Sequence, residues 1–218
     1  MWNWLLSSLM TGATIVLYDG NPMWPDTGAM WRLIDEERVS IFGTSATYLN
    51  YIKTHGLKPK DEFNLSSLRE ISQTGSVLSP EGWEWVYDAA KANLHFNSIA
   101  GGTDFNGAFL GGNLLMPVHA GEMQWWTLGK KCAAYGPEGK PVVDHQGELV
   151  CEAAIPSMPL HFWNDPDGAK YHAAYFAMYP GKWRHGDFIQ VHSDTGGITM
   201  YGRSDSTLNP SGVRIGTA

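Results

Sequence analysis

A stretch that ends in two glycines, a hydroxyl and a carboxylate is the first segment whose residue types could do chemistry. Residues 98–104 read Ser-Ile-Ala-Gly-Gly-Thr-Asp, and paired glycines let a backbone approach a ligand closely. The carboxylate of Asp104 could then meet a hard cation, because such ions prefer oxygen ligands. A plain Gly-Gly turn, with Thr103 and Asp104 capping a helix, is the ordinary alternative.

Two later segments add a carboxylate and two guanidinium groups. In residues 183–187, Trp-Arg-His-Gly-Asp, Gly186 makes a turn that leaves Asp187 at the head of a strand, able to accept two hydrogen bonds from a vicinal diol. Arg203 and Arg214 stand in a turn-rich stretch of an otherwise acidic chain, which suits phosphate or ribose recognition. An exposed turn aspartate and solvated loop arginines are the alternatives.

Several common enzyme classes lack their motifs in this chain. There is no G-x-S-x-G, and Ser76 lacks the second glycine of a nucleophile elbow. The eight histidines are scattered without an H-E-x-x-H pair, so a histidine-based metal enzyme is disfavoured. The G-x-x-x-x-G-K-[ST] and G-x-G-x-x-G nucleotide fingerprints are absent too.

The elements that must position these segments change character along the chain. Strands alternating with helices up to about residue 105 predict a parallel sheet covered by helices, and ligands of such sheets bind at strand C-termini. Beyond about residue 110, short strands between Gly, Pro and Asp turns predict a small antiparallel barrel or sandwich. The fold class is therefore α/β, a parallel sheet with flanking helices followed by a β-barrel-like subdomain. Expected strands are 13–18, 39–42, 68–72, 94–99, 147–152, 187–191 and 197–201; expected helices are 2–9, one capped by Asp26 or Thr27, 45–53, and one opened by Ser79 and Pro80.

The net charge and the cysteine content limit which binding partners and which kinds of site the chain could have. With 15 Lys+Arg against 22 Asp+Glu, a net charge of -7 disfavours broad binding to nucleic acid or an anionic membrane. Cys132 and Cys151 are too few for a disulfide framework and too far apart for a typical zinc motif. No apolar run is long enough to span a membrane and no targeting segment is evident, so we expect a soluble cytoplasmic protein.

Both ends of the sequence resemble internal cuts. Trp2, Leu5, Leu6 and Leu9 form the stripe of an amphipathic helix with no capping residue ahead of it. Residues 202–218 are rich in turn formers and stop without a closing helix or strand. We therefore expect an internal fragment of a longer protein.

Taken in order, these segments resemble the adenylate-forming (AMP-binding) acyl-CoA synthetase superfamily, and within it the ligases that activate acetoacetate. The resemblance spans the whole chain and implies an α/β subdomain over 1–110, a β-rich subdomain over 111–202, and over 203–218 a hinge and the start of a truncated C-terminal domain. The matching stretches are residues 2–4, 12–20, 74–76, 80–85, 147–152, 156–168, 185–187 and 201–218.

The resemblance also implies a reaction and a site. Such enzymes join an acid to ATP as an acyl-adenylate, release pyrophosphate, and let the thiol of coenzyme A displace AMP. The implied cofactors and substrates are ATP, Mg²⁺, coenzyme A and acetoacetate. The matching positions are Gly75, Ser76 and Val77 at adenine; Thr103 and Arg214, the catalytic pair, at phosphate; Asp104 at magnesium, where the superfamily more often has Glu; Asp187 and Arg203 at ribose; Asp205 at the hinge; and Ser211 and Gly212 near coenzyme A.

One segment of the sequence bears on which acid is the substrate. Related acetyl-CoA synthetases carry bulky tryptophans just ahead of the Thr-acidic pair, whereas this chain has Ala100, Gly101 and Gly102 there. A larger acyl pocket favours acetoacetate over acetate, since each methylene contributes only about 1–3 kcal/mol of discrimination. Another short-chain acid remains open. The family's phosphate loop and its adenylate-contacting lysine fall outside residues 1–218, so we expect the chain alone to be inactive.

A binding module of a different class is the remaining alternative, because the chain carries 10 Trp and 9 Tyr that could stack on sugars or peptides. The ligase hypothesis requires Thr103, Asp104, Asp187 and Arg203 to converge on one cleft. The module hypothesis requires an exposed aromatic strip.

Overall fold

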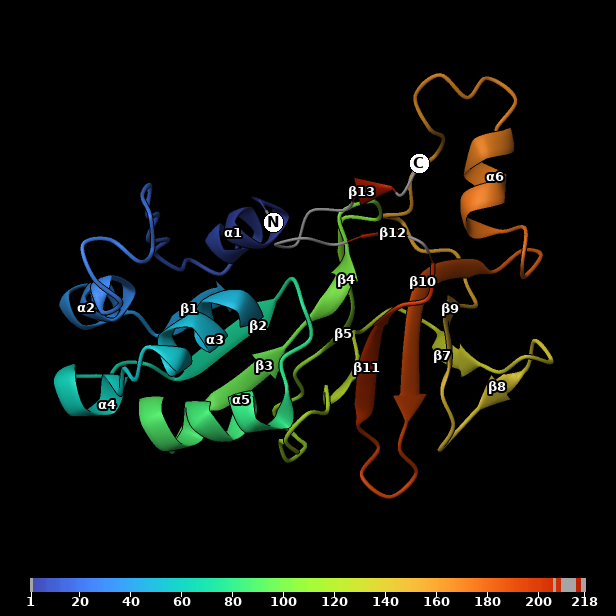
Figure 1. Ribbon diagram of the computed structural model, residues 1–218. Coiled ribbons are helices and arrows are strands. Elements are labelled where there is room, and N and C mark those ends of the chain that lie inside the picture. Colours follow the sequence, from blue (N-terminus) through green and yellow to red (C-terminus); the bar gives the residue numbers. More distant parts are fainter. Residues whose placement is uncertain (1, 206, 209–214, 217–218) are drawn as a thin grey trace. The chain divides into compact units, whose positions relative to one another are not determined.

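The computed structural model describes residues 2–205, 207–208 and 215–216, and the chain divides into two compact units. The first unit covers residues 1–98 and the second covers residues 99–218. Each is described by itself (Figure 1). No described helix is long and apolar enough to cross a membrane.

The first unit is built on a parallel sheet of three strands, in the order β1, β2, β3. Its register places Phe42, Ile71 and Phe96 side by side, and all three are buried. Aromatic side chains from the helices pack on this row: Trp31 meets Phe42 at 5.7 Å and Trp83 meets Phe96 at 4.8 Å between ring centroids. The elements are α1 (Trp2–Leu9), α2 (Ala29–Glu36), β1 (Ile41–Ser45), α3 (Ala46–Thr54), α4 (Pro59–Glu62), β2 (Glu70–Thr74), α5 (Pro80–Trp85), a π-helical turn η1 (Val86–Ala90) and β3 (His95–Ser98).

The expected strand at residues 13–18 is wrong. The structure has no regular element there, and Leu17 and Tyr18 are exposed. A β-branched run becomes a strand only when a neighbour pairs with its backbone, and in the described sheet β1 pairs with β2 alone.

The second unit is antiparallel throughout its described sheets. Five strands run in the order β11, β10, β9, β7, β8; three run β4, β5, β6; and β12 pairs with β13. These separate sheets make up the region that the sequence predicts as barrel-like. An isolated bridge between Met123 and Ile198 links the segment before β6 to β11. The elements are β4 (Ala100–Gly102), β5 (Gly107–Gly111), β6 (Trp125–Trp126), β7 (Cys132–Tyr135), β8 (Pro141–Val142), β9 (Gly147–Cys151), α6 (Ala169–Tyr175), β10 (Trp183–Val191), β11 (Ile198–Arg203), β12 (Thr207–Leu208) and β13 (Ile215–Gly216).

The core of the second unit lies between these strands and α6. Phe105, Phe109, Leu149, Trp183 and Ile189 are all completely buried in it. Figure 1 shows β10 and β11 as a long hairpin, drawn in red, and this hairpin carries Asp187 and Arg203, the two residues that the resemblance assigns to ribose. The mixed α/β architecture, with a parallel sheet followed by antiparallel sheets, is confirmed.

One face of the first unit's sheet carries a polar cluster centred on Glu70. Its carboxylate accepts hydrogen bonds from Ser72 Oγ at 2.5 Å and from Asn97 Nδ2 and His95 Nδ1, both at 3.0 Å. Burial by itself raises the pKa of this carboxyl, but the three donors outweigh it and hold the pKa below its usual value.

Replacing Glu70 with Gln tests this cluster through its pH dependence. A carboxyl whose pKa is lower in the folded state contributes stability above its unfolded pKa and loses it as pH falls through the folded pKa. We expect Glu70→Gln to lower the free energy of unfolding by about 1–2 kcal/mol at neutral pH, and the difference to vanish in acid. Urea denaturation from about pH 7 to about pH 3 measures it. A difference that stays constant across this range contradicts the assignment.

Candidate active site

The register of β10 and β11 sets Asp187 directly opposite Arg203. Nη1 of the guanidinium lies 3.3 Å from Asp187 Oδ1 and donates to the carbonyl oxygen of His185, also at 3.3 Å. Asp187 is preceded by Gly186, whose φ of +84° is a conformation that favours glycine. The strand pairing therefore brings together two residues that lie sixteen positions apart.

Arg203 also holds Asp205. Its Nε donates to Asp205 Oδ1 at 3.0 Å, and Nη2 contacts Oδ2, which makes the pair bidentate. Burial lowers the pKa of Arg203, but the charges of Asp205, Asp187 and Asp104 outweigh this and raise it. The guanidinium thus remains charged between carboxylates that are themselves mostly shielded from water, with side chains 12% exposed at Asp187 and 31% at Asp205.

His185 extends the cluster into the core. Its ring is completely buried, lies edge-on to Phe109 at 4.7 Å between centroids, and places Nε2 3.4 Å from Asp187 Oδ2. The indole N–H of Trp183 donates to His185 Nδ1 at 3.4 Å. Because an indole nitrogen can only donate, Nδ1 accepts, and the proton of a neutral imidazole stands on Nε2 beside Asp187.

Asp104 reaches the same cluster from the turn after β4. Its Oδ2 accepts a hydrogen bond from Tyr175 Oη at 2.7 Å, and Tyr175, the last residue of α6, stacks on Trp183 with centroids 3.6 Å apart. A β-carbon built on Gly102 would lie 2.0 Å from Asp104 Oδ1 and 2.8 Å from His185 Cε1, so these two side chains are neighbours. Asp104, Asp187, Arg203 and Asp205 therefore converge, and the exposed Thr103 precedes Asp104.

A cavity of about 360 Å³ opens beside this cluster. Arg184, on its wall, is held by Glu148, with Nε 3.2 Å from Oε1, while Ser204 Oγ donates to that same oxygen at 2.6 Å. The cavity is thus lined by two arginines, each already paired with a carboxylate, and by the Asp205 carboxylate itself. Its lining residues are Ala173, Ala174, Tyr175, Arg184, His185, Gly186, Arg203 and Asp205.

Comparison with known proteins identifies the family. The sequence profile described as "AMP-binding enzyme" matches residues 1–150. The chain belongs to the AMP-binding enzyme family. Its whole length is 51% identical to an acetoacetyl-coenzyme A synthetase of Rhizobium meliloti (strain 1021) and 47% identical to an acetoacetyl-CoA synthetase of Danio rerio, covering 33% and 32% of those proteins. The solved structure of acetoacetyl-CoA synthetase from Streptomyces lividans matches with a TM-score of 0.86 at 45% identity, over 99% of this chain and 33% of that one.

The chain therefore spans about a third of the length of the curated relatives it matches. Other residues assigned from the AMP-binding resemblance belong to the first unit or to the part of the chain that the structure does not describe. Gly75, Ser76 and Val77 are exposed in the first unit, directly after β2, at the C-terminal end of a parallel strand where ligands of such sheets bind. The positions assigned to coenzyme A and to the second phosphate contact, Ser211, Gly212 and Arg214, lie outside the described residues.

The glycines of the expected acyl pocket in this family member have a local packing role. A β-carbon on Gly101 would lie 2.1 Å from the carbonyl oxygen of Gly107 and 2.5 Å from Ala108 Cα. These are backbone atoms of β5, which pairs with β4, so a side chain at 101 would force the two strands apart. Glycine at this position is explained by strand packing, and the acyl-pocket role of Ala100, Gly101 and Gly102 stays a prediction.

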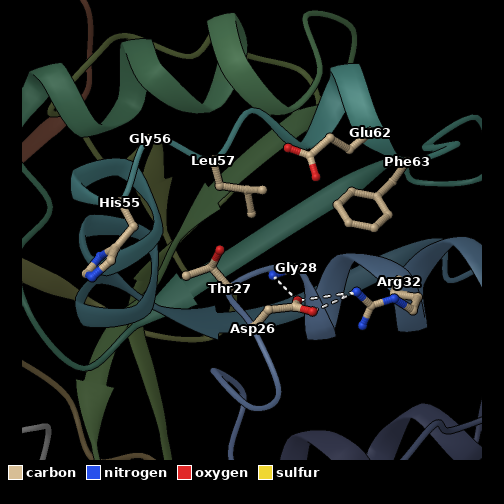
Figure 2. Close-up of a pocket in the computed structure, with 9 residues that line it drawn as sticks. All are labelled: Asp26, Thr27, Gly28, Arg32, His55, Gly56, Leu57, Glu62 and Phe63. Atoms are coloured by element: carbon tan, nitrogen blue, oxygen red, sulfur yellow. Dashed lines mark hydrogen bonds and ion pairs between the residues drawn. The ribbon is translucent and has the colours of Figure 1, made fainter.

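A second hollow, of about 290 Å³, lies in the first unit and contains none of the predicted site residues. Asp26 organises it: Oδ1 accepts from the backbone N–H of Gly28 at 2.8 Å, and Oδ2 lies 3.1 Å from Arg32 Nη2 (Figure 2). Both charged side chains are about half exposed, so water screens this pair. Figure 2 shows the ion pair at one side of the hollow and the ring of His55 at the other.

The sequence does not assign to the site two residues that contact the Arg203 cluster, which consists of Asp104, Asp187, Arg203 and Asp205; they are His185 and Tyr175. Trp183, His185 and Asp187 are two positions apart along one strand and therefore share a face. This spacing places His185 on the same face as Asp187 and could have pointed to its place in the site. Tyr175 had no such signal, because its contact with Asp104 joins residues 71 positions apart. Within the described part of the chain, no group of three or more His, Cys, Asp and Glu could by itself hold a metal ion.

Gly186→Ala tests how tightly Arg203 is held. A β-carbon at Gly186 would lie 2.5 Å from Arg203 Nη2 and 2.6 Å from Asp205 Oδ2, so the ion pair must move. Gly202 also has a positive φ, of +103°, but a β-carbon there meets nothing within 4 Å. We expect Gly186→Ala to cost about 1–2 kcal/mol more in unfolding free energy than Gly202→Ala, measured by urea denaturation. Equal costs would show that backbone strain alone matters.

Proposed function

We propose that this chain is the central part of a longer AMP-forming acetoacetate–CoA ligase. The observation that carries the proposal is identity of 45–51% along the whole chain to proteins named acetoacetyl-CoA synthetase. The complete protein would join acetoacetate to ATP, release pyrophosphate, and pass the acyl group from AMP to coenzyme A. Its partners would be these small molecules, in the cytoplasm, with no role for nucleic acid or a membrane.

The Arg203 cluster would hold the nucleotide. Asp187 uses one oxygen toward Arg203 and the other toward His185, and an ionised carboxylate has about four acceptor sites, so both oxygens can still accept from ribose hydroxyls. Arg203 would contribute its charge and fix the carboxylate's orientation. Arg214 would contact phosphate, Ser211 and Gly212 would border coenzyme A, and Gly75, Ser76 and Val77 would line the adenine pocket.

Asp104 suits a magnesium site of the kind that a nucleotide completes. Mg²⁺ commonly takes one or two protein carboxylates and fills its remaining positions with water and phosphate oxygens. A single carboxylate oriented by Tyr175 fits that requirement, and the bound ion would neutralise phosphate charge. Thr103, exposed beside it, would donate its hydroxyl to the α-phosphate.

Asp205 would serve as the hinge between the large domain and the C-terminal domain. Its bidentate contact with Arg203 supports this role, because the contact ties the segment after β11 to the proposed ribose site. Movement at a hinge requires only a few backbone dihedrals to change.

The activity is tested by acid-dependent exchange of pyrophosphate into ATP, using the complete gene product. We expect kcat/KM for acetoacetate to exceed that for acetate by at least about tenfold, because a pocket shaped for the longer acid loses contacts with the shorter one. Butyrate separates recognition of chain length from recognition of the keto group. A preference for acetate, or exchange that no acid stimulates, contradicts the proposal.

A further inference from the structure

The two cysteines of the chain face each other across neighbouring strands of the second unit. Cys132 begins β7, Cys151 ends β9, and the antiparallel register pairs them directly. Both thiols are free. The proposed ligase reaction uses neither of them.

The hydrogen-bond pattern places this pair where cross-strand side chains come closest. The backbone N–H of Glu152 donates to the carbonyl oxygen of Lys131 at 2.7 Å, so the adjacent pair, 131 with 152, is the hydrogen-bonded one. Bonded and non-bonded pairs alternate along an antiparallel ladder, and Cys132 with Cys151 is therefore a non-bonded pair. Such pairs have Cα atoms about 4.5 Å apart, inside the range of about 4.4–6.8 Å that a disulfide spans.

The two sulfurs differ in environment and already interact. Cys151 is 1% exposed within the core, whereas Cys132 lies half-buried at its edge. A hydrogen bond from the Cys132 thiol lowers the pKa of Cys151, and the same contact raises the pKa of Cys132. The Cys151 thiol also donates to the carbonyl oxygen of Ala153 at 3.2 Å, so Cys151 lies in a chain of contacts that fixes its sulfur beside that of Cys132.

We propose that Cys132 and Cys151 form a peroxide-reactive dithiol that closes reversibly to a cross-strand disulfide. The Cys151 thiolate attacks one oxygen of a hydroperoxide, the O–O bond breaks, and hydroxide or alkoxide leaves with a proton from solvent. Cys151 is then a sulfenic acid. The Cys132 sulfur attacks the Cys151 sulfur, the S–O bond breaks and water leaves, carrying the Cys132 proton. Two thiols are oxidised, and one hydroperoxide is reduced to water and, from an alkyl hydroperoxide, an alcohol.

The test is hydrogen peroxide titration of the protein, followed by intact mass and peptide mapping. We expect the mass to fall by two hydrogen atoms, a linked peptide joining residues 132 and 151, and full reversal by dithiothreitol. The oxidation rate should rise with pH, because the thiolate is the form that attacks the peroxide. Unlinked peptides, or a disulfide that joins two molecules, overturn the proposal.

Two matched variants assign the roles. Cys132→Ser should stop at the sulfenic acid of Cys151, which dimedone traps. Cys151→Ser should react with peroxide at least about tenfold more slowly, because an ordinary thiol is only a few per cent ionised at neutral pH. Equal rates in the two variants would contradict the assigned nucleophile. Peptide mapping of the wild-type protein decides the pairing even where a variant folds poorly.

Discussion

Replacing Arg203 with alanine is expected to lower the free energy of unfolding by about 3–5 kcal/mol, since the change leaves the buried Asp187 and the partly buried Asp205 without their cation. Asp187 and Asp205 both contact the guanidinium, and the side chains of Arg203 and Asp187 are only 15% and 12% exposed. Removing the arginine leaves two negative charges in each other's vicinity with little water to screen them. Urea denaturation at neutral pH measures the loss.

The Arg32–Asp26 pair provides a matched control for the Arg203 prediction. It is also an arginine–carboxylate contact, at 3.1 Å, but its side chains are 43% and 52% exposed. Arg32→Ala should therefore change stability by less than about 1 kcal/mol. The stability loss of Arg203→Lys should lie between those of Arg203→Ala and Arg32→Ala. Lysine keeps the positive charge but lacks the planar guanidinium that contacts Asp205 through two nitrogen atoms. Equal losses in Arg203→Ala and Arg32→Ala would contradict the structural account of the cluster.

Replacing Asp187 with alanine in the complete gene product is expected to weaken ATP binding by at least about 100-fold. The proposed ribose contact consists of two charge-assisted hydrogen bonds, each worth about 1.5–3 kcal/mol. The fold should tolerate this change better than Arg203→Ala, because Arg203 keeps its bidentate partner Asp205. Isothermal titration calorimetry with ATP gives the dissociation constant.

Asp194→Ala serves as the control for Asp187, since Asp194 is an exposed carboxylate in the turn of the same hairpin. Its ATP affinity should stay within about threefold of the wild type, well below the effect of losing one charge-assisted hydrogen bond. An Asp187 variant that binds ATP as tightly as the Asp194 variant would remove the ribose assignment. The family membership and the fold would be unaffected.

Local signals in the sequence predicted much of the first unit because they act within a few residues. Ser45 was expected to start a helix, and its side chain accepts from the backbone N–H of Tyr48 at 3.2 Å, at the N-terminus of α3. Alternating strands and helices predicted the parallel sheet, although β1 begins two residues later than the expected start at 39. The predicted strand at residues 13–18 was wrong because a strand forms only beside a neighbouring strand, and local composition does not specify that neighbour.

The candidate site was predictable in its residues and unpredictable in its contacts. Asp104, Asp187 and Arg203 were singled out by type and spacing, and the structure brings them together. The bidentate pairing of Arg203 with Asp205 depends on the turn after β11, and the Tyr175–Asp104 bond depends on where α6 packs. The packing of Gly101 against Gly107 was likewise hidden, because pocket size and strand packing both call for a residue without a side chain.

The discrimination between ATP and 2′,3′-dideoxyATP tests most directly whether the Asp187 carboxylate binds ribose. The complete gene product should bind ATP at least about 100-fold more tightly than the dideoxy analogue, because the analogue lacks both hydroxyl donors. In Asp187→Ala that ratio should collapse to within about threefold of unity, with the affinity for the analogue little changed. A ratio that survives the substitution would contradict the account, since some other group would then be binding the ribose.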